Sequence, residues 1–576
     1  IFDEFSTDGC PVAACQNKGE PMEGSYEYGN WVLIGLGLYM VLMLLIGWYA
    51  SKKISTTTDY VVAGRRLGIF FCTGTLFATW FGSGTCMGGA GNAYIFGNQG
   101  VVFDPWGAAL CLILTGFFFA RLMRRGRYIT LVDLFELRYG RKMGLFATAS
   151  LSIAEMGWVG AQLVAFGTII NYFSGIPLGV GITISTAILV VYTYLGGMWA
   201  VTLTDVFQMI ILMVGMTIML VVAVPLVGGW DVVFSNDPSN IMGINQWSFV
   251  PTSAAAANPE MENAGYFYYT GYVGWFYWLA AWLAIGFGSI PAQDLMQRVL
   301  SAKDEKTASY SSYLAGLLYV TVGMMPVIIG MIYFHINPDL SIDDALNKIL
   351  LLMAVEHLHP FFAVLFVSAL VAALMSSSDS AILAASSIIG YNGYKYFNPD
   401  ADGHQTLKLT KIMVPIVTII SLMLALYFQV IYNLMVIAWS LLLVSLFVPY
   451  AAAYFWKKAN NYGAIAAFWG GLTVWIASYF CYLPMTKAAN TDLGIKGAEA
   501  GLYFDWAMWD SLYISSVWAL IGSLVCLVAV SLATQKRDVP KPLVDIDGNP
   551  MPISDWKGFF RKHQPASTET VSVTDR

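Results

Sequence analysis

Charged side chains are scarce in this sequence. Only 11% of its 576 residues are Asp, Glu, Lys or Arg, and 57% are hydrophobic, whereas a soluble domain carries about a quarter charged residues. Apolar runs recur from Trp31 to Ala533, and each is close to the roughly 20 residues that a helix needs to cross a bilayer. We therefore expect an all-α integral membrane protein with about thirteen transmembrane helices, and not the alternating strands of an outer-membrane barrel.

Motifs for several other activities are missing. No basic cluster alternates with aromatic residues, so we expect no nucleic-acid partner. No glycine-rich stretch ends in the Lys-Ser/Thr pair of a phosphate-binding loop, which argues against ATP-driven transport within this chain. A channel's repeated selectivity-filter pattern is also missing. Because no nucleophile, base and orienting group share a face, we expect neither an enzyme nor an organic cofactor.

Cysteine and histidine are rare, with seven and five residues. Cys10 and Cys15 lie close together outside an apolar run, and whether a disulfide joins them stays open. The other five cysteines fit buried small hydrophobic residues. The chain begins with Ile1 and shows no cleavable signal peptide, so a processed and a trimmed start both stay open.

Lys and Arg are distributed unevenly among the connections. With the N-terminus outside, 26 of the 30 basic residues fall on the inner side, in line with the positive-inside rule. We expect a plasma or inner membrane protein with an external segment (1–30), a transmembrane domain (31–534) and a mobile cytoplasmic tail (535–576). The oligomeric state is left open.

Glycine interrupts two of the apolar runs. The interruptions are Trp80-Phe-Gly-Ser-Gly-Thr85 and Gly286-Phe-Gly-Ser-Ile-Pro291. Broken backbone at membrane depth is tolerated where it lines a cavity, and paired interruptions point to a transporter's binding site. Close helix packing through small residues is the alternative. The spacing of the two breaks suits inverted repeats over about 67–227 and 266–455.

Polar residues from Ser376 to Ser380 lie inside the apolar run of 361–390. Ala373, Ser376 and Ser377 stand at i, i+3 and i+4, so one carbonyl and two hydroxyls can address one point. Sodium is a hard cation that takes several such oxygen ligands. The alternative is that each serine bonds to the carbonyl four residues before it.

The remaining sodium ligands have to come from a helix with unoccupied carbonyls. A continuous helix uses its carbonyls internally, whereas the break at Gly82–Gly84 frees those just before it. These carbonyls belong to Ala78 and Phe81. The sequence thus predicts a sodium site between the first broken helix and the serine-rich helix.

Five motifs resemble the sodium:solute symporter family and follow the family's order. They are Phe77-Ala-Thr-Trp-Phe-Gly-Ser-Gly84, Gly196-Gly-Met-Trp-Ala-Val-Thr-Leu-Thr-Asp-Val-Phe-Gln208, Gln297-Arg-Val-Leu-Ser-Ala-Lys303, Ala372-Ala-Leu-Met-Ser-Ser-Ser-Asp-Ser380 and Lys458-Ala-Asn-Asn-Tyr-Gly-Ala464. The resemblance implies a LeuT-type fold of two inverted five-helix repeats and sodium-coupled uptake of a small organic solute. By matched position it also implies a common sodium site at Ala78, Phe81, Ala373, Ser376 and Ser377.

Intramembrane acids are placed by the same resemblance. Asp205 stands where some members hold a second sodium ion, and an N-cap at the start of a helix is the equal alternative. Asp379 resembles an aspartate of the choline-transporter branch, where it would tune the sodium site or carry a proton, and Ser380 lies beside it. Glu155 either faces Asp379 from the other repeat or pairs with a neighbouring helix.

Candidate substrate residues gather around the two breaks. Trp80 and Trp158 resemble aromatic residues with which the choline-transporter branch cages a quaternary ammonium. The third tryptophan of that branch corresponds to Ala292, so the predicted cage is incomplete, and ordinary packing of the tryptophans is the alternative. The full predicted set is Trp80, Gly82, Thr85, Trp158, Gln162, Ser289, Ala292 and Gln293.

The solute itself is left open by the sequence, with a choline-like amine and an amino acid such as proline as candidates. The number of coupled ions is left open as well. The competing function is a sensor that binds a solute without accumulating it. The tail after residue 535 carries no kinase or dimerisation pattern, which favours a symporter.

Overall fold

The computed structural model describes residues 23–52, 56–235, 245–253, 264–266, 269–492 and 506–553. Cys10 and Cys15 lie outside the described residues. Among the described residues, ten helical stretches are long and apolar enough to cross a membrane. The predicted all-α membrane fold is therefore confirmed, whereas the predicted number of thirteen spans stays a prediction.

The first half of the chain is helical throughout its described part. Its elements are α1 (Glu23–Ser51), α2 (Thr57–Val62), η2 (Ala63–Arg65), α3 (Ile69–Trp80), η3 (Gly84–Gly88), α4 (Gly89–Phe96), η4 (Gly97–Val101), η5 (Val102–Gly107), α5 (Ala108–Leu114), η6 (Thr115–Phe119), α6 (Ala120–Gly126), α7 (Leu131–Tyr139), α8 (Arg141–Ser174), α9 (Leu178–Leu226) and α10 (Trp230–Val233). Gly197 adopts φ 60° and ψ 179° inside α9, a conformation open to glycine and foreign to a helix. α9 therefore consists of two helical segments that meet at a kink.

The second half begins with a small three-stranded antiparallel sheet and continues as helices. Its elements are β1 (Thr252–Ser253), β2 (Ala264–Tyr266), β3 (Tyr269–Thr270), α11 (Gly271–Gly286), α12 (Gln293–Ser301), α13 (Glu305–Val322), α14 (Met324–Ile336), α15 (Ile342–His357), α16 (Pro360–Ser387), η7 (Ile388–Gly393), α17 (Tyr394–Phe397), α18 (Gly403–Phe428), α19 (Ile431–Leu442), η8 (Leu443–Phe447), α20 (Val448–Phe455), α21 (Asn461–Asp492) and α22 (Trp506–Thr534). In the sheet, Thr252 lies opposite Gly265 and Tyr266 opposite Tyr269.

Both predicted helix breaks are present. α3 ends at Trp80, Phe81 has the non-helical angles φ −76° and ψ 70°, and η3 begins at Gly84. α11 ends at Gly286, and α12 begins only at Gln293. The predicted pair of interrupted helices is confirmed.

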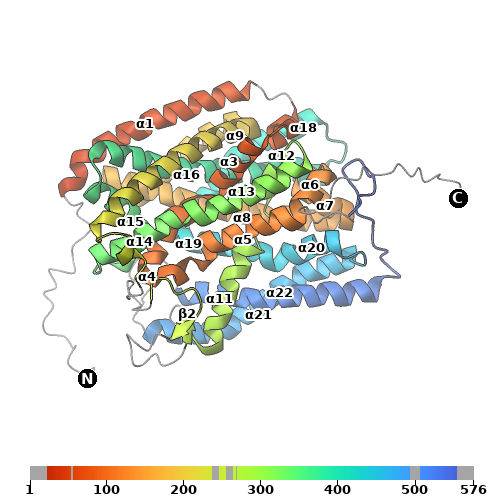
Figure 1. The fold of residues 1–576 in the computed structure, drawn as a ribbon. Coiled ribbons are helices and arrows are strands. Elements are labelled where there is room, and N and C mark those ends of the chain that lie inside the picture. Colours follow the sequence, from red (N-terminus) through yellow and green to blue (C-terminus); the bar gives the residue numbers. More distant parts are fainter. Residues whose placement is uncertain are drawn as a thin grey trace.

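The helices form one bundle with the serine-rich helix inside it. Figure 1 shows α1 along one edge of the bundle and the packed pair α21 and α22 along the opposite edge. α16 lies between them and packs against α8 and α9. Every residue of α16 from Phe366 to Ser387 is buried, which is expected of a helix at the centre of a large bundle. The polar residues of α16 are therefore shielded from lipid.

Two of the helices, α7 and α15, are short, with 9 and 16 residues. α7 lies near α6 and α15 lies near α4, at opposite ends of the bundle (Figure 1). Ser341 precedes α15 as its N-cap, and its hydroxyl accepts a hydrogen bond from the amide of Asp344. Both helices are shorter than a bilayer-crossing run, so a search for long apolar stretches passes over them.

The cysteines are only partly as predicted. Cys72, Cys86 and Cys111 are buried, but Cys481 is exposed and Cys526 is half-buried. The prediction of burial is wrong for these last two because they lie on α21 and α22, at the edge of the bundle.

The segment after α22 packs against the end of the bundle. Arg138 Nη1 donates to the carbonyl of Lys541 (2.5 Å), and the Tyr128 hydroxyl donates to that of Val544 (2.6 Å). The predicted mobility is wrong for residues 535–553, because bonds of this kind fix the backbone of a polar segment that its composition alone would leave free. The rest of the tail lies outside the described residues.

Candidate functional site

Three of the predicted sodium ligands converge where α16 passes the break in α3. Ser376 Oγ lies 2.8 Å from the carbonyl oxygen of Ala78 and 2.9 Å from that of Ala373, and can donate its one proton to either. All three residues are buried. Ser376 therefore does not form the predicted bond to the carbonyl four residues before it, whereas Ser378 does, to Leu374 (2.6 Å). The Ser376 hydroxyl also reaches across to the broken helix.

Ser377 faces the backbone of the break. A Cβ added to Gly82 would lie only 2.5 Å from Ser377 Oγ, so glycine is required for this close approach. Ser377 Oγ is buried and has no hydrogen-bond partner among the described residues. Phe81, the fifth predicted ligand, is buried in the non-helical link next to Gly82. A buried hydroxyl without a partner costs about 1–3 kcal/mol, a cost that a bound ion would offset.

Gln162 contacts the backbone of the break in α3 at Ser83. Its Oε1 accepts a hydrogen bond from the amide of Ser83 (2.8 Å), one of the amides that the interrupted helix leaves free. A Cβ on Gly82 would lie 2.7 Å from Gln162 Nε2. Gln162, predicted as a substrate contact, therefore positions the broken backbone from α8.

Thr85 belongs to a buried polar network of which only Thr85 itself was predicted. Thr85 Oγ1 donates to Asp104 Oδ2 (2.8 Å) and lies 2.7 Å from the hydroxyl of Tyr319. The Tyr319 hydroxyl donates in turn to the carbonyl of Trp80 (2.5 Å). Asp104 and Tyr319 come from η5 and α13, so no local sequence pattern joins them to the break.

The predicted second ion site contains a buried guanidinium. Arg298 Nη2 lies 3.9 Å from Asp205 Oδ2 and donates to Ser380 Oγ. Thr75 Oγ1 also donates to Asp205 Oδ2 (2.5 Å), and Ser380 Oγ lies 3.4 Å from Asp379 Oδ1. All five residues are buried. Arg298 is thus the buried cation beside Asp205 and, through Ser380, Asp379, and its charge also acts on the buried acids Asp294 and Glu155.

The structure also bears on the alternatives for Asp205 and Glu155. The N-cap alternative for Asp205 is wrong, because Asp205 lies inside α9, eight residues after the Gly197 kink. Glu155 Oε1 accepts from the amide of Asp294 (3.1 Å), in the first turn of α12. This contact favours the alternative in which Glu155 pairs with a neighbouring helix. Arg298 was quoted only within a family motif, and its role becomes visible only when α12 is placed beside α9 and α16.

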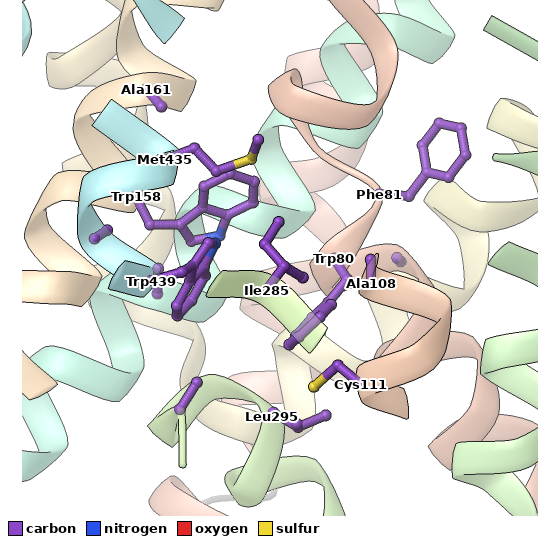
Figure 2. Packing of buried hydrophobic residues seen from close by; sticks show 14 of the residues in the cluster. Trp80, Phe81, Ala108, Cys111, Trp158, Ala161, Ile285, Leu295, Met435 and Trp439 are labelled. Carbon is purple, nitrogen blue, oxygen red and sulfur yellow. The ribbon is translucent and has the colours of Figure 1, made fainter. Parts of the chain in front are cut away.

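Three tryptophans surround one cavity. The ring of Trp439 lies 6.0 Å from that of Trp80, stacked at 20°, and 5.9 Å from that of Trp158, at 50°. Figure 2 shows Trp439 with Trp158 and Met435 on one side of the cluster and Trp80 near Ala108. The cavity holds about 10 Å³, which is room for about one water molecule. Its lining residues are Trp80, Asp104, Ala108, Trp158, Ile285, Tyr319, Met435 and Trp439.

Trp439 is the third tryptophan at the cavity, and the sequence did not single it out. It comes from α19, and Met435 one turn before it lines the same cavity, as the i, i+4 spacing indicates. The Nε1 atoms of Trp80 and Trp158 are buried without a partner among the described residues. The third tryptophan of the cavity thus comes from α19, a helix that no matched motif pointed to.

The three predicted residues around the second break do not line this cavity in the described structure. Ser289 Oγ donates to the carbonyl of Ile285 (2.5 Å), and Ala292 is the buried N-cap of α12. Gln293 Oε1 accepts from the amide of Leu131 (2.7 Å) and so joins α12 to α7. The side chains of Ser289 and Gln293 thus bond to backbone groups.

Comparisons with known proteins give a consistent result. Residues 60–471 match the model of the sodium:solute symporter family. The high-affinity choline transporter 1 of Caenorhabditis elegans is 28% identical over 475 residues, covering 77% of each chain, and the human high affinity choline transporter 1 is 28% identical over 470 residues, covering 78% of this chain and 77% of its own. The sodium/pantothenate symporter of Escherichia coli is 27% identical over 450 residues, covering 76% of this chain and 88% of its own.

Solved structures extend the likeness to the fold. A Na+-coupled sialic acid symporter in a substrate-bound outward-open state has a TM-score of 0.65 at 21% identity, covering 86% of this chain and 98% of its own. Mhp1, a nucleobase-cation-symport-1 family transporter, has a TM-score of 0.51 at 15% identity, covering 83% of this chain and 95% of its own. At these identities the likeness shows the fold alone, and it confirms the predicted LeuT-type arrangement.

Proposed function

Because this chain belongs to the sodium:solute symporter family and is a sodium-coupled symporter, we propose that its solute is a quaternary amine of the choline class. The observation that carries the proposal is the cluster of Trp80, Trp158 and Trp439 around one cavity. A cation held against tryptophan faces gains about 2 kcal/mol or more when it is desolvated. A quaternary ammonium has no N–H to donate, so aromatic faces suit it better than hydrogen-bond acceptors do.

Binding requires the cage to open. Trp80 and Trp439 are stacked at 6.0 Å, and a cation that contacts the facing sides of both rings has to lie between them. The present cavity has room for about one water molecule. We expect Trp439 to move away from Trp80 as the solute arrives, and the rings to close on the ammonium afterwards.

The sodium ion would bind at Ala78, Phe81, Ala373, Ser376 and Ser377. The close approach of Ser376 to two carbonyls and the unpartnered hydroxyl of Ser377 support this site. Such an ion would tie α16 to the last turn of α3. Inward movement of one sodium ion yields about 2.3 kcal/mol per 100 mV of membrane potential, which drives accumulation of the solute.

A second ion or a proton would bind near Asp205, Asp379 and Ser380. Arg298 already balances one of the two carboxylates. A further monovalent cation would offset negative charge that Arg298 leaves uncompensated. The described geometry fits a sodium ion and a proton equally, since hydroxyl and carboxylate oxygens are available to either.

We place the chain in the plasma or inner membrane with its N-terminus outside. Arg124, Arg125 and Arg127 gather at the end of α6, and Arg127 pairs with Asp547 of the tail segment (2.8 Å). Basic residues concentrate on the cytoplasmic side of membrane proteins, so this end and the tail would both be cytoplasmic.

The proposal is tested by uptake of labelled choline into proteoliposomes under an inward sodium gradient. Wild-type protein should accumulate choline, and Trp439→Ala should lose this uptake because one face of the cage is gone. Trp31→Ala is the matched control, since Trp31 lies on α1 and is 64% exposed. Equal uptake by the two variants would contradict the cage. Saturable choline binding without sodium-driven accumulation would favour the sensor instead.

A further inference from the structure

A carboxylate lies in the wall of the tryptophan cavity. Asp104 is 2% exposed and lines the cavity from η5. Its Oδ2 accepts the hydrogen bond of Thr85, whereas its Oδ1 is buried and has no partner among the described residues. Oδ2 is therefore fixed by Thr85, and Oδ1 is available to a ligand.

No cation of the protein compensates Asp104. No Lys, Arg or His in the described part of the chain forms an ion pair with it, whereas Arg298 stands beside Asp205 in the other buried cluster. A buried carboxylate without a counter-charge is costly, and such residues in membrane segments face a partner, a cavity or a transported charge. The partner of Asp104 is therefore to be sought in the cavity that it lines.

We propose that Asp104 is the counter-charge of the transported solute and makes the cavity select organic cations over zwitterions that carry the same ammonium group. This inference rests on the proposed function. The tryptophans by themselves accept any quaternary ammonium, including one that carries a carboxylate. A second carboxylate brought close to Asp104 in this water-poor cavity is repelled, so the aspartate supplies the discrimination that the rings cannot.

The free oxygen adds a preference within the organic cations. Asp104 Oδ1 is an acceptor without a donor among the described residues. The other oxygen, Oδ2, accepts from Thr85, which also bonds with Tyr319, and the Tyr319 hydroxyl donates to the carbonyl of Trp80. A hydroxyl or a protonated amine on the arm next to the ammonium would donate to Oδ1 while the rings hold the ammonium. Cations with such a donor should bind better than fully alkylated ones of the same size.

The test compares wild type with Asp104→Asn, which removes the charge and keeps the shape. In wild type, choline should be taken up and trimethylglycine, its carboxylate counterpart, should compete poorly. In Asp104→Asn the KM for choline should rise by about tenfold or more, the loss expected for one charge-assisted hydrogen bond. Competition by trimethylglycine should improve, and the sodium concentration for half-maximal uptake should stay unchanged.

Two further variants guard against a merely misfolded protein. Asp104→Glu keeps the charge and should keep the preference for choline over trimethylglycine. Asp510→Asn removes another buried carboxylate, one that accepts from Tyr269 and Tyr277, and should leave the choline KM unchanged. Improved competition by trimethylglycine in Asp104→Asn is a gain that an unfolded protein cannot show.

Each adverse outcome has a distinct meaning. Wild-type protein that takes up no organic cation overturns the proposed function and this inference together. Wild type that takes up choline, with an unchanged KM and unchanged exclusion of trimethylglycine in Asp104→Asn, overturns the inference alone. A shift of the sodium dependence with an unchanged choline KM also overturns it, because Asp104 would then be an ion ligand.

Discussion

Replacing Ser377 with Ala tests the sodium site more cleanly than any other single change. Ser377 Oγ has no hydrogen-bond partner among the described residues, so its loss removes no hydrogen bond within that part of the protein. Ser376→Ala, by contrast, also removes a hydroxyl that links α16 to the carbonyl of Ala78. A changed sodium dependence in Ser377→Ala therefore indicates a lost ion ligand and not a change in the packing of α3 against α16.

The expected size follows from the chemistry of one ligand. A hydrogen bond or ligand contact to a charged group contributes about 1.5 kcal/mol, and about 1.4 kcal/mol corresponds to a tenfold change in affinity. We expect Ser377→Ala to raise the sodium concentration for half-maximal uptake by about tenfold. Ser376→Ala should do the same and should also lower the melting temperature without sodium, because a helix-to-helix bond worth about 1 kcal/mol is lost.

Two assays measure this difference. Solute uptake into proteoliposomes over a series of sodium concentrations gives the half-saturation value. The sodium-dependent rise of the melting temperature of purified protein gives the ion affinity without transport, since a ligand that binds the native state stabilises it. Ser378→Ala is the matched control, because Ser378 Oγ bonds to the carbonyl of Leu374 four residues before it (2.6 Å) and is equally buried.

The site assignment fails if Ser377→Ala and Ser378→Ala respond to sodium as wild type does. It fails as well if both variants shift by the same amount, because a general disturbance of α16 would then explain the result. A tenfold shift confined to Ser376→Ala and Ser377→Ala supports the ligand geometry.

Two further predictions concern charges away from the tryptophans. Arg298→Gln should destabilise the protein by about 3 kcal/mol, because two buried carboxylates lose their cation; adding Asp205→Asn should restore part of the melting temperature, and a lower melting temperature in the double variant would refute the pairing. Glu136 lies in α7, between the candidate spans, where burial, and after it the charge of Asp133, raises its pKa from 4.5 to about 7. The folded state thus keeps a proton that the unfolded chain releases, so this contribution to stability is present below pH 4.5 and is lost as the pH rises to about 7. The melting temperature of Glu136→Gln should therefore exceed that of wild type at pH 8 and approach it at pH 5, and a gap independent of pH would contradict the shift.

Local sequence patterns predicted the proposed sodium site. The residues of the tryptophan cavity, by contrast, come together only through the packing of segments that are distant in the sequence. The i, i+3, i+4 spacing of Ala373, Ser376 and Ser377 and the glycine break near Gly82 are readable because each lies within one helix. Their facing one another was an inference from ligand chemistry, and the bond between Ser376 and Ala78 agrees with it.

Asp104, Trp439 and Arg298 could not be assigned in the same way. Each comes from a different element, η5, α19 and α12, and each acquires its role from a neighbour more than fifteen residues away in the chain. A tryptophan in an apolar run is usually a packing residue, and nothing in its own segment separates Trp439 from the eighteen other tryptophans of the chain. Only the placement of α19 against α3 and α8 brings its ring against those of Trp80 and Trp158.

The short distance between the proposed sodium site and the proposed tryptophan cage offers a physical route for coupling sodium binding to solute binding. Ala78, whose carbonyl faces Ser376, and Trp80, whose ring stacks on Trp439, belong to the last turn of α3. Two residues of a helix span about 3 Å along its axis, so a sodium ion that draws the carbonyl of Ala78 toward α16 also fixes the position of the Trp80 ring. Sodium would then hold one wall of the cage in place before the solute arrives, and the solute would bind a site whose ordering had already been achieved. Coupling of this kind is reciprocal, so choline should tighten sodium binding by the same factor by which sodium tightens choline binding.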